Sequence, residues 1–94
     1  MKRMFLVISF LALLLPSTAG AEMDFEKDKI ETASGPLIIT FIGHGTLMFS
    51  HVNTIIHVDP WSNLADYSAL PKADIILITH EHRDHLDPEA IKKI

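Results

Sequence analysis

Residues 79–85, Thr79-His80-Glu81-His82-Arg83-Asp84-His85, decide the fold, because they place three histidines and an aspartate within six positions. They follow the apolar run 74–79, which is typical of a strand buried on both faces. In an extended chain, residues two apart point to the same side, so His80, His82 and Asp84 can converge. Imidazole nitrogen and carboxylate oxygen are ligands that suit zinc and similar divalent ions. The stretch therefore predicts a metal-binding loop at the C-terminal end of a strand.

A second ion is expected because His85 is turned from that row by one residue. Two ions about 3.5–4 Å apart can activate a bridging water and polarise a scissile bond. The helical zinc motif H-E-x-x-H is a competing interpretation, since Glu81 follows His80. It fails because the fourth position after His80 is Asp84 and the segment follows a strand. An exposed polar loop without ligands is the other alternative, which the position at a strand end disfavours.

The rest of the chain predicts short strands followed by a helix. The strands are predicted because their apolar runs are short, are rich in β-branched and aromatic residues, and are separated by turn residues. A helix should begin at Asp87-Pro88-Glu89, with Asp87 as cap, Pro88 in the first position and Glu89 at the positive end of the dipole. The predicted elements are strands at 37–42, 46–50, 54–58 and 74–79, a tight turn at 43–45, a hairpin turn at 51–53, and a loop at 61–72 with a helical turn within 64–70.

The N-terminus predicts export. A basic start, an apolar run over 5–15 and Ala19-Gly20-Ala21 form the layout of a signal peptide, residues 1–21, with cleavage after Ala21. The apolar run is too short for a membrane span of about 20 residues, so no stable membrane anchor is expected after cleavage. The processed protein is expected in the periplasm or outside the cell. Residues 22–36 are charged and form either a linker or an edge strand. Residues 37–94 are expected to be the N-terminal part of a longer domain, because the chain stops within a helix that lacks a C-terminal cap.

The composition excludes several kinds of partner and site. The formal net charge is -4, and no cluster of Lys and Arg is present to follow a phosphate backbone, which argues against a nucleic acid partner. The chain has no cysteine. Any metal site must therefore use histidines and carboxylates. A small-molecule substrate is the expected partner. The sequence does not define an oligomeric state.

The stretch Thr79 to Asp87 resembles the H-x-H-x-D-H signature of metallo-β-lactamase fold hydrolases. The resemblance extends through residues 41–46, Phe-Ile-Gly-His-Gly-Thr, and residues 57–61, His-Val-Asp-Pro-Trp. These stretches are similar to the branch that contains L-ascorbate 6-phosphate lactonase-like proteins and N-acylphosphatidylethanolamine-hydrolysing phospholipase D. The resemblance covers about residues 37–94. It implies an αββα sandwich of the α/β (α+β) class, of which this chain would be the N-terminal sheet and first helix.

The same resemblance implies roles for individual residues. His80 and His82 would bind one ion, Asp84 and His85 the second, and Asp84 would also orient the bridging hydroxide, a catalytic role. Asp59 would support the metal loop without touching metal, although a turn-capping role before Pro60 is the alternative. The remaining ligands of the family would lie beyond residue 94. Zinc is the expected metal at both positions, with manganese or iron as alternatives.

The other polar and aromatic residues have weaker assignments. His44 is predicted either at the rim of the active site or in a purely local turn role. His51 is expected to be exposed in a hairpin turn, and His57 to be an interior histidine with satisfied hydrogen bonds. Trp61 and Tyr67 either line a substrate entrance or pack against neighbours.

The expected function is an exported metal-dependent hydrolase in which a metal-bound hydroxide attacks a lactone, ester or phosphodiester. The lactonase-like branch is the first expectation and a phospholipase D-like phosphodiesterase the alternative. A protein of another class, a non-catalytic metal-binding relative of the same fold or an inactive fragment, would also bind metal but would not hydrolyse these substrates.

Overall fold

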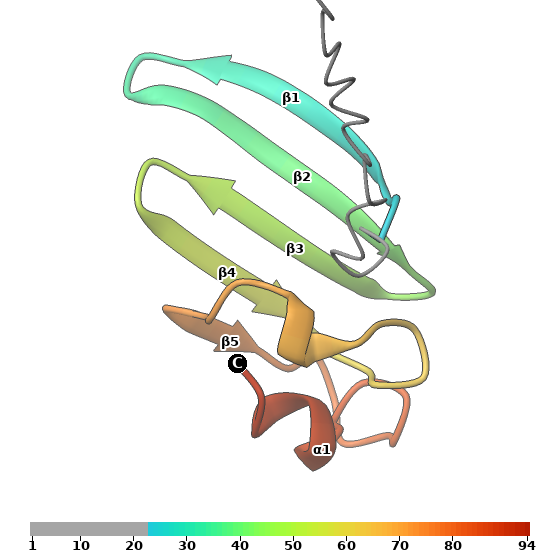
Figure 1. Cartoon of the computed structure of the whole chain (residues 1–94). Helices are drawn as coiled ribbons and strands as arrows, with labels where there is room; N and C mark the ends of the chain where they lie inside the picture. Colours follow the sequence, from blue (N-terminus) through green and yellow to red (C-terminus); the bar gives the residue numbers. More distant parts are fainter. Residues whose placement is uncertain (1–22) are drawn as a thin grey trace, which may run out of the picture.

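A five-stranded sheet forms the centre of the computed structural model, which describes residues 23–94. The predicted signal peptide lies outside these residues. The strands lie side by side in chain order (Figure 1), and they are β1 (Glu26–Thr32), β2 (Gly35–Gly43), β3 (Thr46–His51), β4 (Thr54–Val58) and β5 (Ile75–Leu77). The first four pair antiparallel, and β5 pairs parallel with β4. The strands predicted within 37–58 are confirmed with small shifts at their ends.

One face of the sheet is covered and carries most of the buried residues. The strand register aligns Thr40, Met48 and His57 on this face, and all three are buried. Tyr67 covers them from the short 3-10 helix η1 (Tyr67–Ala69), where its ring lies 5.7 Å from that of His57. The predicted helical turn is therefore confirmed, and it covers the sheet.

The opposite face is apolar and open. The register aligns Ile39, Phe49, Ile56 and Ile75 across four strands of this face, and none of these side chains is buried. The prediction that residues 74–79 form a strand buried on both faces is wrong for this reason. β5 covers only three residues, and Ile75 and Leu77 are 45% and 51% exposed.

β1 forms the outer edge of the sheet. Of the two alternatives for the charged N-terminal segment, the structure has a strand, and every residue of it is exposed. Charged side chains on an edge strand discourage pairing with other chains. None of the helices within residues 23–94 has the length and apolar character required to cross a membrane.

The helix α1 (Pro88–Ile91) begins where the sequence predicts. The Asp87 side chain accepts a hydrogen bond from the backbone N–H of Glu89 at 3.0 Å, and Pro88 occupies the first turn. Asp87 also accepts a bond of 2.8 Å from the backbone N–H of Ser62. The cap thus ties the helix to the loop that follows β4.

Three connections meet at one end of the sheet. β2, β4 and β5 run in the same direction, so the β2–β3 turn, the segment after β4 and the segment after β5 leave from the same end. Figure 1 shows this end on the right, where the yellow and orange-red loops lie beside the green β2–β3 turn. Residues far apart in the sequence, from positions 44, 59 and 80–85, are brought together there.

Candidate metal centre

His85 lies at the centre of the histidine cluster. Its ring centroid is 3.9 Å from that of His80 and 5.3 Å from that of His44. Gly45 allows this approach, because a Cβ at that position would lie only 3.0 Å from Cε1 of His85. The Gly-His-Gly turn therefore packs directly against the metal loop.

Asp59 joins the end of β4 to the metal loop from a buried position, with 1% of its surface exposed. Its carboxylate Oδ1 accepts the backbone N–H of Thr79 at 2.7 Å, and Oδ2 accepts from Nδ1 of His85 at 2.8 Å. Burial alone would raise the pKa of Asp59, but the hydrogen bonds from Thr79 and His85 outweigh it and hold the pKa below its ordinary value. The ionised carboxylate is therefore occupied by hydrogen bonds and suited to support the loop.

The hydrogen bond to Asp59 determines which nitrogen of His85 is left for a ligand. A carboxylate can only accept, so Nδ1 of His85 must donate. In the neutral ring, Nε2 then carries a lone pair, and this atom lies 3.4 Å from Oδ2 of Asp84. His85 and Asp84 therefore present a nitrogen and an oxygen donor side by side, as binding of one divalent ion requires.

His44 holds Asp84 from the other side. The two side chains meet at 2.8 Å between Nε2 of His44 and Oδ2 of Asp84. This bond is the main reason why the pKa of Asp84 is lowered, so that the carboxylate is ionised near neutral pH. His44 has a left-handed backbone, φ 50°, which histidine adopts more readily than most residues. The structure thus brings His44 to the site; its predicted rim role stays a prediction.

The four predicted ligands are not equally close. Ligand atoms lie within 4.8 Å of one another in two groups, His44 with Asp84 and His85, and Asp59 with His80 and His85. His82 belongs to neither group, but its ring centroid is 4.7 Å from that of His80. The donor set of imidazoles and carboxylates fits a divalent ion of the zinc type. The ligand roles themselves stay predictions.

One contributor to this site, Thr79, is missing from the sequence prediction, and Trp61 is present there only with two alternative roles. The Thr79 hydroxyl contacts both Asp59 and His80, at 2.5 and 2.8 Å. Trp61 lies beside the site, with its ring 5.7 Å from that of His44. Thr79 directly precedes the first histidine, which was the available signal, whereas the position of Trp61 depends on the fold of the loop after β4. Tyr67 is fully buried and packs against the sheet, so it does not line an entrance.

The remaining histidines lie outside this cluster. His57 is fully buried as predicted, and its Nε2 bonds the carbonyl of Pro71 at 2.9 Å, but its Nδ1 has no partner. The prediction that His51 is exposed in a turn is wrong. His51 ends β3, is half-buried, and its Nε2 lies 3.0 Å from Oγ1 of Thr32, because strand pairing extends to His51 and leaves only Val52 and Asn53 in the turn.

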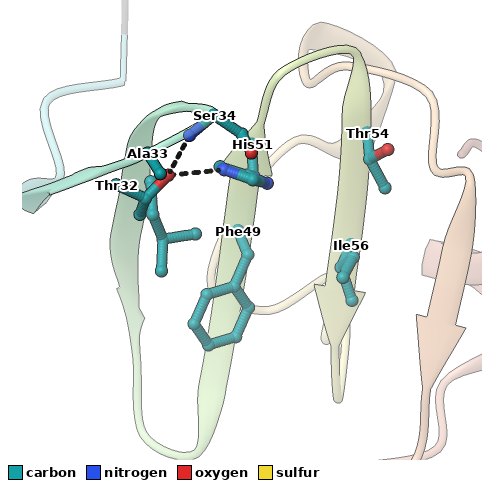
Figure 2. A pocket seen from close by; sticks show the side chains of 8 residues that line it. Thr32, Ala33, Ser34, Phe49, His51, Thr54 and Ile56 are labelled. Carbon is teal, nitrogen blue, oxygen red and sulfur yellow. Dashed lines mark hydrogen bonds between the residues drawn. The ribbon is translucent and has the colours of Figure 1, made fainter.

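Figure 2 shows a groove next to His51, at the end of the sheet opposite the candidate metal centre. It has a volume of about 560 Å³ and a largely apolar lining, with His51 as its one ionisable side chain. The lining residues are Thr32, Ala33, Ser34, Leu37, Phe49, His51, Thr54 and Ile56. This groove offers no second metal-binding cluster.

The fold and the site define a class of protein, a mixed sheet with a cluster of histidines and carboxylates at the C-terminal ends of its strands. Residues 38–94 match the family described as Beta-lactamase superfamily domain, and the chain belongs to this family. The mixed sheet with η1 and α1 corresponds to the N-terminal part of the αββα sandwich, which confirms the predicted fold class.

Individual relatives agree with this family. A crystal structure from Parabacteroides distasonis, of a protein provisionally named a metal-dependent hydrolase, is 58% identical with a TM-score of 0.72, over 76% of this chain and 33% of that chain. N-acyl-phosphatidylethanolamine-hydrolyzing phospholipase D 1 of Caenorhabditis elegans is 29% identical over 84 residues, 71% of this chain. A protein of Mycolicibacterium smegmatis, provisionally named a Rieske 2Fe-2S iron-sulfur protein, is 33% identical over 70 residues, 58% of this chain.

The chain spans 23% and 13% of the lengths of these two curated relatives. The comparisons support metal-dependent hydrolase chemistry at the level of the family. They do not single out the lactonase-like branch, and the activity and substrate of the whole protein are matters for proposal.

Proposed function

We propose that this protein is a metal-dependent hydrolase, and that residues 80–85 hold part of a centre of two divalent ions, zinc by preference. In this proposal His80 and His82 bind one ion, and Asp84 and His85 bind the other. The observation that carries it is the Asp84–His85 pair, which His44 and Asp59 orient from opposite sides at 2.8 Å each. The 58% identity to a protein provisionally named a metal-dependent hydrolase supports the same conclusion.

When bound, a pair of divalent ions lowers the pKa of water and polarises the bond to be cleaved. The side chains of this chain would prepare that chemistry. Asp84 is held ionised and is available to orient the attacking oxygen, while His44 limits the rotation of its carboxylate. Asp59 keeps Nε2 of His85 available as a ligand atom. Such preorganisation reduces reorganisation during the reaction.

A phosphodiester is the substrate class that the comparisons favour. The C. elegans relative is named as a phospholipase D, an enzyme that cleaves a phosphodiester bond. A lactone or an ester of the lactonase-like branch is the second candidate, supported by the resemblance of residues 41–46 and 57–61. All three substrates carry an electrophilic centre and an oxygen leaving group, so one centre can serve any of them.

The test uses the intact protein and two variants. Metal content is measured by mass spectrometry, and hydrolysis is measured with bis(4-nitrophenyl) phosphate, a nitrophenyl ester and a simple lactone. His82→Ala removes a proposed ligand, and we expect it to lose metal and to reduce hydrolysis by at least a hundredfold. His51→Ala is the matched control, because His51 lies at the opposite end of the sheet.

The outcome separates the hydrolase from its alternatives. Hydrolysis of one substrate that depends on His82 and not on His51 supports the proposal. A protein that binds metal but hydrolyses none of the three substrates is the non-catalytic relative, and the enzyme proposal is then abandoned. An unchanged metal content in His82→Ala would remove His82 from the ligand set.

A further inference from the structure

We infer that Asp59 and Thr79 together set the ring tautomers of His80 and His85, and that Thr79 is a positioning residue for His80. The inference rests on the proposed function in one respect, namely that His80 and His85 belong to different metal ions. It assigns a role to a hydroxyl that is neither a ligand nor part of the histidine motif.

The argument begins with the single proton of the Thr79 hydroxyl. Oγ1 of Thr79 lies 2.5 Å from Oδ2 of Asp59 and 2.8 Å from Nδ1 of His80. A hydroxyl donates one hydrogen bond, and an ionised carboxylate only accepts. The Asp59 carboxylate also accepts the backbone N–H of Thr79 and faces Nδ1 of His85, so it is the acceptor in this network and the Thr79 proton points to it.

The second contact of Thr79 then has only one possible direction. Oγ1 has used its proton, so it must accept from His80, and Nδ1 of His80 carries the hydrogen. In the neutral ring the lone pair is therefore on Nε2. Without Thr79 the ring would be free to adopt the opposite tautomer, in which Nε2 carries the proton and cannot bind a metal.

The tautomer of His85 is set by the same oxygen atom, Oδ2 of Asp59. Its Nδ1 donates to Oδ2 of Asp59 at 2.8 Å, which leaves its Nε2 with the lone pair. The backbone N–H of Thr79 holds the other carboxylate oxygen at 2.7 Å, so the carboxylate cannot rotate freely. The buried Asp59 carboxylate thus fixes the tautomers of two histidines, that of His85 directly and that of His80 through the Thr79 hydroxyl. Partners of metal-binding histidines commonly fix the ring tautomer in this way.

The structure also explains why a hydroxyl is needed at position 79. Asp59 is 1% exposed and is tied to β5 by its backbone N–H, which donates to the carbonyl of Leu77 at 2.9 Å. The Asp59 carboxylate is therefore held beside the C-terminal end of β5, whereas His80 lies in the loop that follows β5. The Thr79 side chain spans this separation.

The test compares Thr79→Val, which has a similar shape but no hydroxyl, with Thr79→Ser, which restores the hydroxyl. Ring nitrogen shifts of the metal-free intact protein are recorded by NMR at pH 8, where neutral rings report their tautomer. We expect Nδ1–H at His80 in the parent and in Thr79→Ser, and mainly Nε2–H in Thr79→Val. His85 should keep Nδ1–H in all three proteins, which makes it the internal control.

Metal binding supplies the second measurement. Titration calorimetry with zinc should show a 10- to 100-fold weaker affinity for one ion in Thr79→Val, in the range found for lost partners of metal ligands, and recovery in Thr79→Ser. If Thr79→Val does not fold, Thr79→Ala removes the same hydroxyl from a smaller side chain. An unchanged His80 tautomer without the hydroxyl, or no recovery with Ser, overturns the inference. Because the tautomer is measured without metal, a protein that binds no zinc would refute the proposed function alone.

Discussion

Gly45 is the residue at which the β2–β3 turn comes closest to the metal loop. Its backbone is not in the left-handed region, so alanine is tolerated there by the backbone, but the added Cβ would meet Cε1 of His85 at 3.0 Å. We expect Gly45→Ala to displace the His85 ring and to weaken metal binding about tenfold, as loss of support to a ligand does. The measurement is zinc affinity by competition with a chelator. Affinity equal to that of the parent would show that the ring is not held in this position.

The hydrogen bond between His44 and Asp84 gives a prediction about acidity. His44 is the main cause of the lowered pKa of Asp84, so His44→Phe should raise this pKa toward the ordinary value of 3.8. Carbon NMR of the Asp84 carboxyl in the metal-free protein, followed from pH 2 to 6, provides the measurement. His51→Phe, at the far end of the sheet, is the control that should leave the Asp84 pKa unchanged. An Asp84 pKa that is the same in His44→Phe as in the parent would rule out this hydrogen bond.

At the scale of elements, β4 carries a buried histidine whose protonation opposes folding. Burial lowers the pKa of His57 from 6.5 in the folded state. As the pH falls below about 6.5, the unfolded chain gains a proton at His57 that the folded chain does not accept, so stability decreases down to the folded-state pKa. The slope from this group is at most about 1.4 kcal/mol per pH unit.

His57→Gln tests this pH dependence, because an amide can still donate to the carbonyl of Pro71 but does not titrate. We expect the free energy of unfolding of the variant to fall less between pH 7 and pH 5 than that of the parent. Urea unfolding at several pH values is the measurement. Parallel curves for the two proteins would contradict a lowered pKa at His57. Below the folded-state pKa, both curves should again run in parallel.

Residue patterns predicted the strands and the start of the helix but not the exposure of β5 or the position of His51. Strand formation followed from β-branched and aromatic content, and the start of α1 followed from Asp87, Pro88 and Glu89. The burial of β5 did not follow. A continuous apolar run does not reveal which of the two faces another layer covers, and Ile75 and Leu77 lie on the face that is open in residues 23–94. His51 was predicted in the turn but belongs to β3, because strand pairing and not residue type decides how far a hairpin extends.

At the scale of the whole molecule, the first prediction concerns export. The proposed signal peptide ends at Ala21, so the N-terminus of the exported protein should be Glu22. N-terminal sequencing of protein recovered outside the cytoplasm checks this position. Ala21→Leu, which replaces the small residue before the cut, should prevent cleavage and keep the precursor in the membrane fraction. An exported protein that still begins with Met1 would refute the proposal.

The sequence by itself predicted a histidine-rich loop after an apolar strand and the succession of the strands within residues 37–58. These properties depend on local spacing and on side-chain shape, which can be read along the chain. The spacing of His80, His82, Asp84 and His85 after an apolar run was sufficient to indicate chemistry at the end of a strand.

The resemblance implied a supporting role for Asp59, but only the tertiary structure shows the contacts that Asp59 and His44 make with that loop. His44 lies 40 positions from Asp84, and Asp59 lies 26 positions from His85, yet both pairs are joined at 2.8 Å. These contacts exist because β2, β4 and β5 end at the same side of one sheet. The direction of the Thr79 hydroxyl, and with it the tautomer of His80, depends on the buried Asp59 carboxylate that this arrangement supplies.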